Sequence, residues 1–153
     1  MATSTESTVT PLRDNDEPPI VREPPHNFDA EQALLGAILV NNLAYGRVSE
    51  FLAPEHFANP DHGRIYDACA KLIERGQIAD PITLRNYLEQ DGGLAEVGGP
   101  QYLAQLAASA VTIINATDYG RMVFDLALRR ELIDLGGDMV NDAFDHDPET
   151  GAM

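Results

Sequence analysis

"ATDYGRMVFDLALRRELIDLGGDMVNDAF", residues Ala116–Phe144, is the stretch that decides the fold. It predicts one long helix with Asn115 as its N-cap, because it lacks proline and its apolar residues recur at helical spacing. On a helical wheel the apolar residues form two stripes on opposite sides. The first stripe contains Tyr119, Met122, Val123, Leu126, Ile133, Val140 and Phe144. The second contains Phe124, Leu128, Leu132, Leu135 and Met139. At about 40 Å, such a helix must protrude from a small globular head, and its two stripes need two packing partners.

Immediately upstream, "PQYLAQLAAS" (Pro100–Ser109) predicts a shorter helix with one apolar stripe. We expect this helix to cover one stripe of the long helix as the other arm of an antiparallel hairpin, residues 98–145. The remaining stripe would then face another chain, and Gly136-Gly137 predicts a bend or fray within the long helix. The candidate oligomer interface on the hairpin comprises Tyr102, Leu103, Leu106, Met122, Phe124, Leu126, Leu128, Leu132 and Leu135.

Two glycine pairs precede this region in "GGLAEVGGPQYL" (Gly92–Leu103), and their spacing is that of the opening of a phosphate-binding loop. Such a loop requires Lys and then Ser or Thr directly after its last glycine, where this chain has Gly99 and Pro100. We therefore expect structural glycines. Gly92-Gly93 would end one helix, and Gly98-Gly99 would turn the chain into the next, with Pro100 at its first position.

The segment 28–97 predicts a globular head of four helices. Asp29 with Gln32 fits a capping box before "ALLGAILV", and a short helix follows over Ala44–Leu52. Asn59 and Asp80 each precede a proline, as expected of N-caps for the third and fourth helices. The fold class is therefore all-α, a small helical head followed by a protruding antiparallel helical hairpin.

The two ends of the chain differ from this pattern. Residues 1–27 are rich in Pro, Ser and Thr and predict a disordered tail without the apolar core of a signal peptide. Residues 146–153 are expected to begin a linker. The net charge of −15 disfavours direct, tight DNA binding. No apolar run is long enough to span a membrane, and the single cysteine, Cys69, is expected to be a buried thiol in a cytoplasmic protein.

Catalytic and metal-binding patterns are weak. His56 and His62 lie six residues apart, but no Cys or clustered carboxylates complete a ligand set. We expect His62 instead to orient the first turn of its helix. The paired acids, such as Asp145 with Asp147, are expected to aid solubility. The sequence thus predicts no catalytic, cofactor-binding or metal site.

Several segments together resemble the N-terminal domain of the bacterial hexameric replicative DNA helicases of the DnaB family. They are "FDAEQALLGAILVNN", "FLAPEHFANPDHGRIYDACAKLIERGQIADPITL", "GGLAEVGGPQYLAQLA" and "NATDYGRMVFDLALRRELI". The resemblance covers about Pro25 to Phe144. Two positions depart from the family pattern: Gly120 stands where a better helix former is expected, and Phe124 where a polar residue is expected.

The resemblance implies a non-catalytic assembly and docking domain. It implies dimers that join as a trimer of dimers in the hexamer collar, and primase as a second partner. ATP and Mg²⁺ would belong to a motor domain beyond this sequence. Two alternatives remain open: the helicase-binding helical domain of a primase, and a small acidic helical enzyme.

Overall fold

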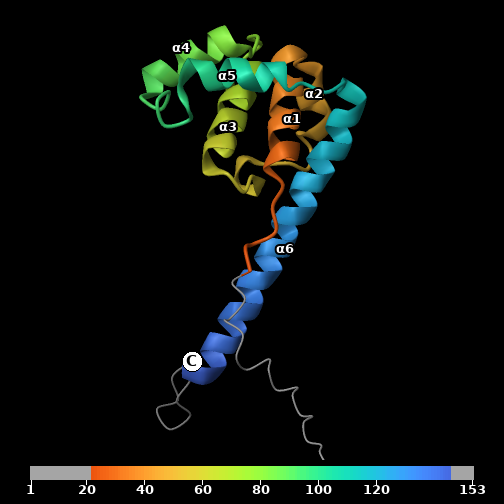
Figure 1. Cartoon of the computed structure of the whole chain (residues 1–153), viewed down its shortest axis with the longest axis vertical. Coiled ribbons are helices and arrows are strands. Elements are labelled where there is room, and N and C mark those ends of the chain that lie inside the picture. The colour runs from red at the N-terminus through yellow and green to blue at the C-terminus, as the bar shows by residue number, and fades with distance from the viewer. Residues whose placement is uncertain (1–21, 146–153) are drawn as a thin grey trace, which may run out of the picture.

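The computed structural model describes residues 22–145, and within them every regular element is helical. In chain order these are α1 (Phe28–Val40), α2 (Leu43–Val48), η3 (Pro54–His56), α3 (Pro60–Glu74), α4 (Pro81–Asp91), α5 (Gly99–Ala108) and α6 (Ile113–Asp145). Helices α1–α5 gather into a head, and α6 runs from the head far beyond it (Figure 1). The predicted all-α class and the protruding helix are confirmed.

Helix α1 begins earlier than the sequence pattern indicates. Its N-cap is Asn27, whose side-chain oxygen accepts a hydrogen bond from the Ala30 N–H at 2.9 Å. The prediction that Asp29 caps this helix is therefore wrong, because the helix has already begun at Phe28. Asp29 lies in the first turn, where its charge still favours the positive end of the helix dipole.

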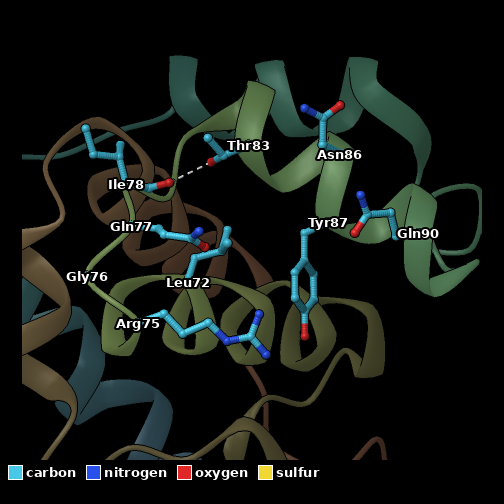
Figure 2. A pocket seen from close by; sticks show the side chains of 9 residues that line it. All are labelled: Leu72, Arg75, Gly76, Gln77, Ile78, Thr83, Asn86, Tyr87 and Gln90. Atoms are coloured by element: carbon cyan, nitrogen blue, oxygen red, sulfur yellow. Dashed lines mark hydrogen bonds between the residues drawn. The ribbon is translucent and has the colours of Figure 1, made fainter.

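The next helices begin closer to prediction. Asn59 and Asp80 are the N-caps of α3 and α4, and their side chains accept from first-turn N–H groups. At α4, the Thr83 hydroxyl accepts a hydrogen bond from the Asp80 N–H. It also donates one to the Ile78 carbonyl (Figure 2). Helix α2 ends at Val48, four residues short of the predicted end, with turns following it.

The long helix α6 starts before Asn115, so the prediction that Asn115 caps it is wrong. Thr112 precedes the helix, and its hydroxyl accepts a 3.4 Å hydrogen bond from the Asn115 N–H. The helix runs without interruption through Gly136 and Gly137, where a bend or fray was predicted. At 33 residues it is about 50 Å long.

The core of the head lies around α1. Leu34, Leu35 and Ile38 are fully buried because α1 packs against α3, α5 and α6 on different sides. Gly36 marks a close approach between α1 and α5, because a Cβ there would overlap the Leu106 carbonyl oxygen of α5. The near-continuous apolar run of α1 is thus the consequence of its central position.

Helix α6 joins the head through small residues. Ala116, Gly120, Val123 and Ala127 form its buried face, which packs on α1 and α2. A Cβ on Gly120 would overlap the Val48 side chain. Glycine at this position is therefore a packing requirement that outweighs its poor helix propensity.

The predicted terminal segments are only partly described. Residues 1–21 and 146–153 lie outside the described residues, as does most of the predicted tail. The boundary of that tail at residue 27 is wrong, because Asn27 caps α1 and the Pro25 carbonyl bonds to Arg130 of α6.

Candidate functional site

The distal half of α6 carries six of the fourteen large apolar side chains that are exposed in the described part of the chain. From Glu131 to Asp145 every residue is exposed. The large apolar side chains in this segment are Leu132, Ile133, Leu135, Met139, Val140 and Phe144, with exposed fractions from 55% to 84%. Soluble proteins rarely leave such contiguous apolar surface uncovered, so this segment is the candidate interaction site.

The apolar side chains of this distal half share one broad face. At about 100° per residue they span a sector of about 180°, with Gly136 and Ala143 near its centre line. The small residues there leave room for a partner helix to approach between rows of larger side chains. The prediction of two opposed stripes is therefore wrong for this part of α6.

The acidic side chains of the distal half lie on the opposite side of the helix. The segment contains five acids and no Lys or Arg. These acids are Glu131, Asp134, Asp138, Asp142 and Asp145. They fall within a sector of about 80°, in line with the small-residue face that packs on the head in the proximal half. The same side of α6 thus changes from a buried packing face to a hydrated acidic face as the helix leaves the head.

Helix α5 does not form the hairpin that the sequence pattern predicts. It crosses the head, where it packs against α1 and α4 (Figure 1). Leu103 and Leu106 are buried in the head core, so their assignment to an oligomer interface is wrong. Tyr102 is half-buried and points into the head. The apolar stripe of α5 was recognised correctly as a buried face, but it is buried against other helices.

The remaining predicted interface residues divide along α6. Phe124 packs edge-on against Phe51 and His56 and belongs to the contact with the head. Leu126 is half-buried, whereas Met122 and Leu128 are about 40% exposed. Among the predicted set, Leu132 and Leu135 lie fully within the exposed distal half.

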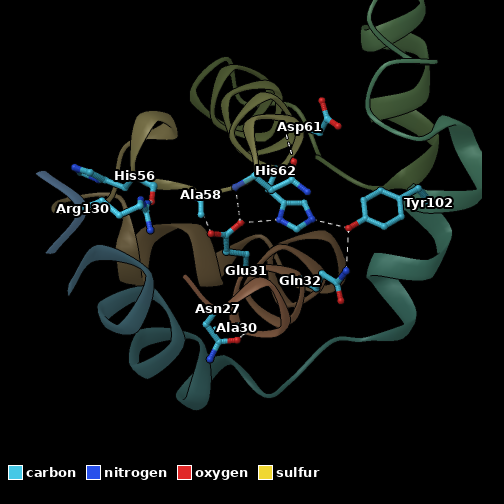
Figure 3. A network of polar contacts seen from close by, with 11 residues as sticks. Asn27, Ala30, Glu31, Gln32, His56, Ala58, Asp61, His62, Tyr102 and Arg130 are labelled. Atoms are coloured by element: carbon cyan, nitrogen blue, oxygen red, sulfur yellow. Dashed lines mark hydrogen bonds and ion pairs between the residues drawn. The ribbon is translucent and has the colours of Figure 1, made fainter. Parts of the chain in front are cut away.

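A buried polar network connects helices of the head near the place where α6 packs against it (Figure 3). Glu31 accepts hydrogen bonds from the N–H groups of Ala58 (2.7 Å) and Asn59 (3.3 Å), and its carboxylate lies 2.8 Å from His62 Nδ1. The other ring nitrogen of His62 contacts the Tyr102 hydroxyl, which also accepts from Gln32. The network therefore ties α1, the start of α3 and α5 to one another.

The same network changes the interpretation of His62. Both of its ring nitrogens are occupied within the head, so it links helices rather than orienting its own turn. Burial, the largest cause, raises the pKa of the Tyr102 hydroxyl. His56 accepts from the Ala53 N–H, and within residues 22–145 no three His, Cys, Asp or Glu side chains cluster as metal ligands.

Sequence reasoning missed two members of this architecture. Glu31 is 2% exposed although it is charged, and the signal was its position on the apolar side of α1 with Leu34 and Leu35. Arg130 lies in the last of the segments that resemble the family, and the sequence pattern predicts no role for it. Its guanidinium donates to the carbonyls of Pro25 and His56, both at 2.8 Å, at the point where α6 leaves the head (Figure 3).

The glycines that raised the question of a phosphate loop have structural positions. Gly92 ends α4 in the left-handed conformation, and Gly98 precedes α5 with a φ of 107°. The helix starts at Gly99, one residue before the predicted Pro100. No helix in residues 22–145 has the length and apolar character needed to cross a bilayer.

Comparison with known proteins identifies consistent relatives. A family model described as DnaB-like helicase N terminal domain matches residues 23–125. The replicative DNA helicase DnaB of Rickettsia felis is 49% identical over 134 residues, which is 88% of this chain and 27% of that protein. The protein of the same name from Geobacillus stearothermophilus is 34% identical over 86% of this chain and 29% of its own length. The chain thus spans little more than a quarter of these relatives.

Solved structures resemble the same region. The N-terminal domain of DnaB helicase from Mycobacterium tuberculosis superposes with a TM-score of 0.78 at 35% identity, covering 81% of this chain and 90% of that one. A DnaB-like replicative helicase, whose structure was described together with its interactions with primase, gives a TM-score of 0.66 at 28% identity. It is covered over 27% of its chain, and 76% of this chain is aligned.

Proposed function

Because this chain belongs to the DnaB-like helicase N-terminal domain family, we propose that it is the non-catalytic assembly and docking domain of a replicative DNA helicase. The exposed apolar face of distal α6 is the observation that carries this proposal. Under this proposal, the apolar face of distal α6 pairs subunits into dimers, and three dimers form the collar of a hexamer. The membership favours the helicase over the helicase-binding domain of a primase.

The energetics of α6 favour reversible self-association of this chain. Covering Leu132, Leu135, Met139 and Phe144 would contribute about 1.5–3 kcal/mol each, or about 6–12 kcal/mol per chain. Association costs about 4–15 kcal/mol in lost translational and rotational entropy. The two quantities are comparable, so the isolated chain should form a concentration-dependent dimer rather than a permanent hexamer.

The charge distribution is compatible with pairing of two copies. The five acids of distal α6 lie opposite its apolar face, so they stay in water when two such faces meet. Self-association should therefore respond weakly to salt, because exposed charges on the outer sides are screened and distant.

Light scattering across a concentration series tests this proposal. Leu132→Glu and Met139→Glu place a charge on the apolar face and should yield folded monomers with unchanged helix content. Asn141→Glu introduces the same side chain on the acidic side and serves as the matched control, which should keep the parent's mass profile. If both apolar-face variants retain the parent's mass at every concentration, distal α6 is not the subunit interface.

Primase is the proposed second partner, since a similar DnaB-like helicase was described with its interactions with primase. Calorimetric titration of the chain with its cognate primase tests this directly. Saturable binding is expected; no heat and no co-migration on size exclusion at about 50 μM would contradict it.

The proposed domain uses no nucleotide cofactor and binds no DNA tightly, and it acts in the cytoplasm. The glycines beside α4 and α5 lie at helix ends and lack a following Lys and Ser or Thr. ATP and Mg²⁺ chemistry would belong to other regions of the full-length helicase. Measurable ATP hydrolysis by the purified chain, or binding to a single-stranded oligonucleotide at about 0.15 M salt, would contradict this part.

A further inference from the structure

A groove lies on the head, between the C-terminal end of α3 with its following loop and one side of α4 (Figure 2). Its volume is about 620 Å³. Leu72 and the ring of Tyr87 provide apolar wall, and Ile78 stands at the rim with 67% of its surface exposed. None of these groups belongs to the distal α6 surface.

Arg75 is the single charged residue among those that line the groove. The Arg75 guanidinium lies 5.9 Å from the centre of the Tyr87 ring, which holds it over the wall by a cation–π contact. Within residues 22–145 no carboxylate lies within ion-pair distance of Arg75, although Arg64, Lys71 and Arg85 all have acidic partners. In a chain of net charge −15, this unpaired guanidinium is available to a carboxylate from outside.

The polar rim fits a peptide backbone. Gln77, Asn86 and Gln90 line the groove with primary amides, each of which can donate to a carbonyl and accept from an N–H. Apolar surface continues past the rim: Asn86 also lines a neighbouring hollow with Ile82, which is 72% exposed. Two adjoining hollows that share Asn86 suit an extended or helical segment of a protein better than a single small metabolite.

From these features we infer that the groove between α3 and α4 docks a segment of a partner protein that carries a bulky apolar side chain beside a carboxylate. The apolar side chain packs between Ile78 and Tyr87, and the carboxylate pairs with Arg75. This surface is separate from distal α6, so one chain can pair with another copy and hold such a segment at the same time.

The test uses two synthetic hexapeptides with blocked ends and the ¹⁵N-labelled chain. One peptide has a central Leu-Phe pair flanked by two glutamates, and its twin has two glutamines in place of the acids. The acidic peptide should shift the amide signals of Gln77, Ile78 and Asn86 with saturation, and the twin should bind at least about fivefold more weakly. Arg75→Gln should remove that difference. Arg47→Gln, a matched change of an exposed arginine on α2, should preserve it.

Three outcomes would overturn the inference. The first is that the two peptides bind equally well, and the second is that Arg75→Gln leaves binding of the acidic peptide unchanged. The third is that inorganic phosphate at the same concentration reproduces the shifts, which would reveal a simple anion site. Leu132→Glu should bind the acidic peptide as the parent does. A loss of self-association in that variant therefore reports on α6 alone, and the two proposals fail independently.

Discussion

The guanidinium of Arg130 donates a 2.8 Å hydrogen bond to the backbone carbonyl of Pro25, which lies 105 residues earlier in the chain. Its second arm reaches the His56 carbonyl of η3, also at 2.8 Å. The planar fork of an arginine suits two carbonyls at once. No residue of α6 beyond Arg130 is buried, and within residues 22–145 Arg130 makes the most C-terminal hydrogen bonds between α6 and the head. We therefore expect it to help fix the direction of the protruding helix.

Replacing Arg130 with Ala should lower the free energy of unfolding by about 1–3 kcal/mol, because two hydrogen bonds to a charged donor are lost. Arg129→Ala is the matched control, since Arg129 makes only an exposed pair with Asp125 and should change stability by less than about 0.5 kcal/mol. Urea unfolding measures both. If the two variants lowered the free energy of unfolding equally, the contact between α6 and the head would not depend on Arg130.

The close approach of α1 and α5 makes Gly36 the most sensitive glycine of the core. In Gly36→Ala the new methyl group would overlap the Leu106 carbonyl, and a backbone group cannot rotate away. We expect a loss of about 2–3 kcal/mol or more, as for overpacked cores. Gly46→Ala in α2 meets open space and should instead gain about 0.5–1 kcal/mol from helix propensity. Thermal unfolding of the two variants measures these changes. An unchanged stability of Gly36→Ala would contradict the close packing of α1 on α5.

The Glu31–His62 pair should show the high sensitivity of a buried network. His62→Ala removes one hydrogen-bond partner from the Glu31 carboxylate and one from the Tyr102 hydroxyl and leaves a cavity between them, so we expect a loss of about 2–4 kcal/mol. Tyr102→Phe removes only the hydroxyl and should cost about 1 kcal/mol. Chemical denaturation provides both values, and a His62→Ala loss no larger than that of Tyr102→Phe would argue against the network.

The sequence predicts helices and caps well where one residue has one local role. Asn59 and Asp80 were found because a capping side chain precedes a proline. Asn27 was missed because Asp29 with Gln32 fits a capping box equally well. The amide of Asn27 also contacts the Met122 sulfur of α6, 95 residues away, and local spacing cannot reveal such a contact.

Packing partners were harder to predict than packing faces. The stripe of α5 indicates burial, but nothing local says that α1 and α4 cover it. The buried face of α6 escaped notice because Ala116, Gly120 and Ala127 carry little hydrophobic signal. Phe124, unexpected in the family pattern, is accounted for by its contacts with Phe51 and His56. The groove at Arg75 depends on how the loop after α3 places α4 beside it, and the spacing of Leu72–Gln90 in the sequence does not reveal that geometry.

The buried thiol of Cys69 makes the free energy of unfolding depend on pH in the alkaline range. Burial raises its pKa from 9.0 to about 12. The folded state therefore favours the protonated thiol: the contribution is fully present below about pH 9 and is lost as pH rises toward 12, since the unfolded chain releases the proton first. Tyr66, whose pKa burial also raises from 10.0, acts the same way at higher pH.

Between about pH 8.5 and 10, the parent should therefore lose about 1 kcal/mol more stability than Cys69→Ala. The cavity left by the alanine lowers stability by an amount that does not vary with pH, so the slope is the readout. Urea unfolding at several pH values measures it, and a thiol reagent at pH 8 should react with the folded parent only as fast as the protein opens. Parallel slopes, or rapid modification of the folded chain, would mean that Cys69 is accessible to water.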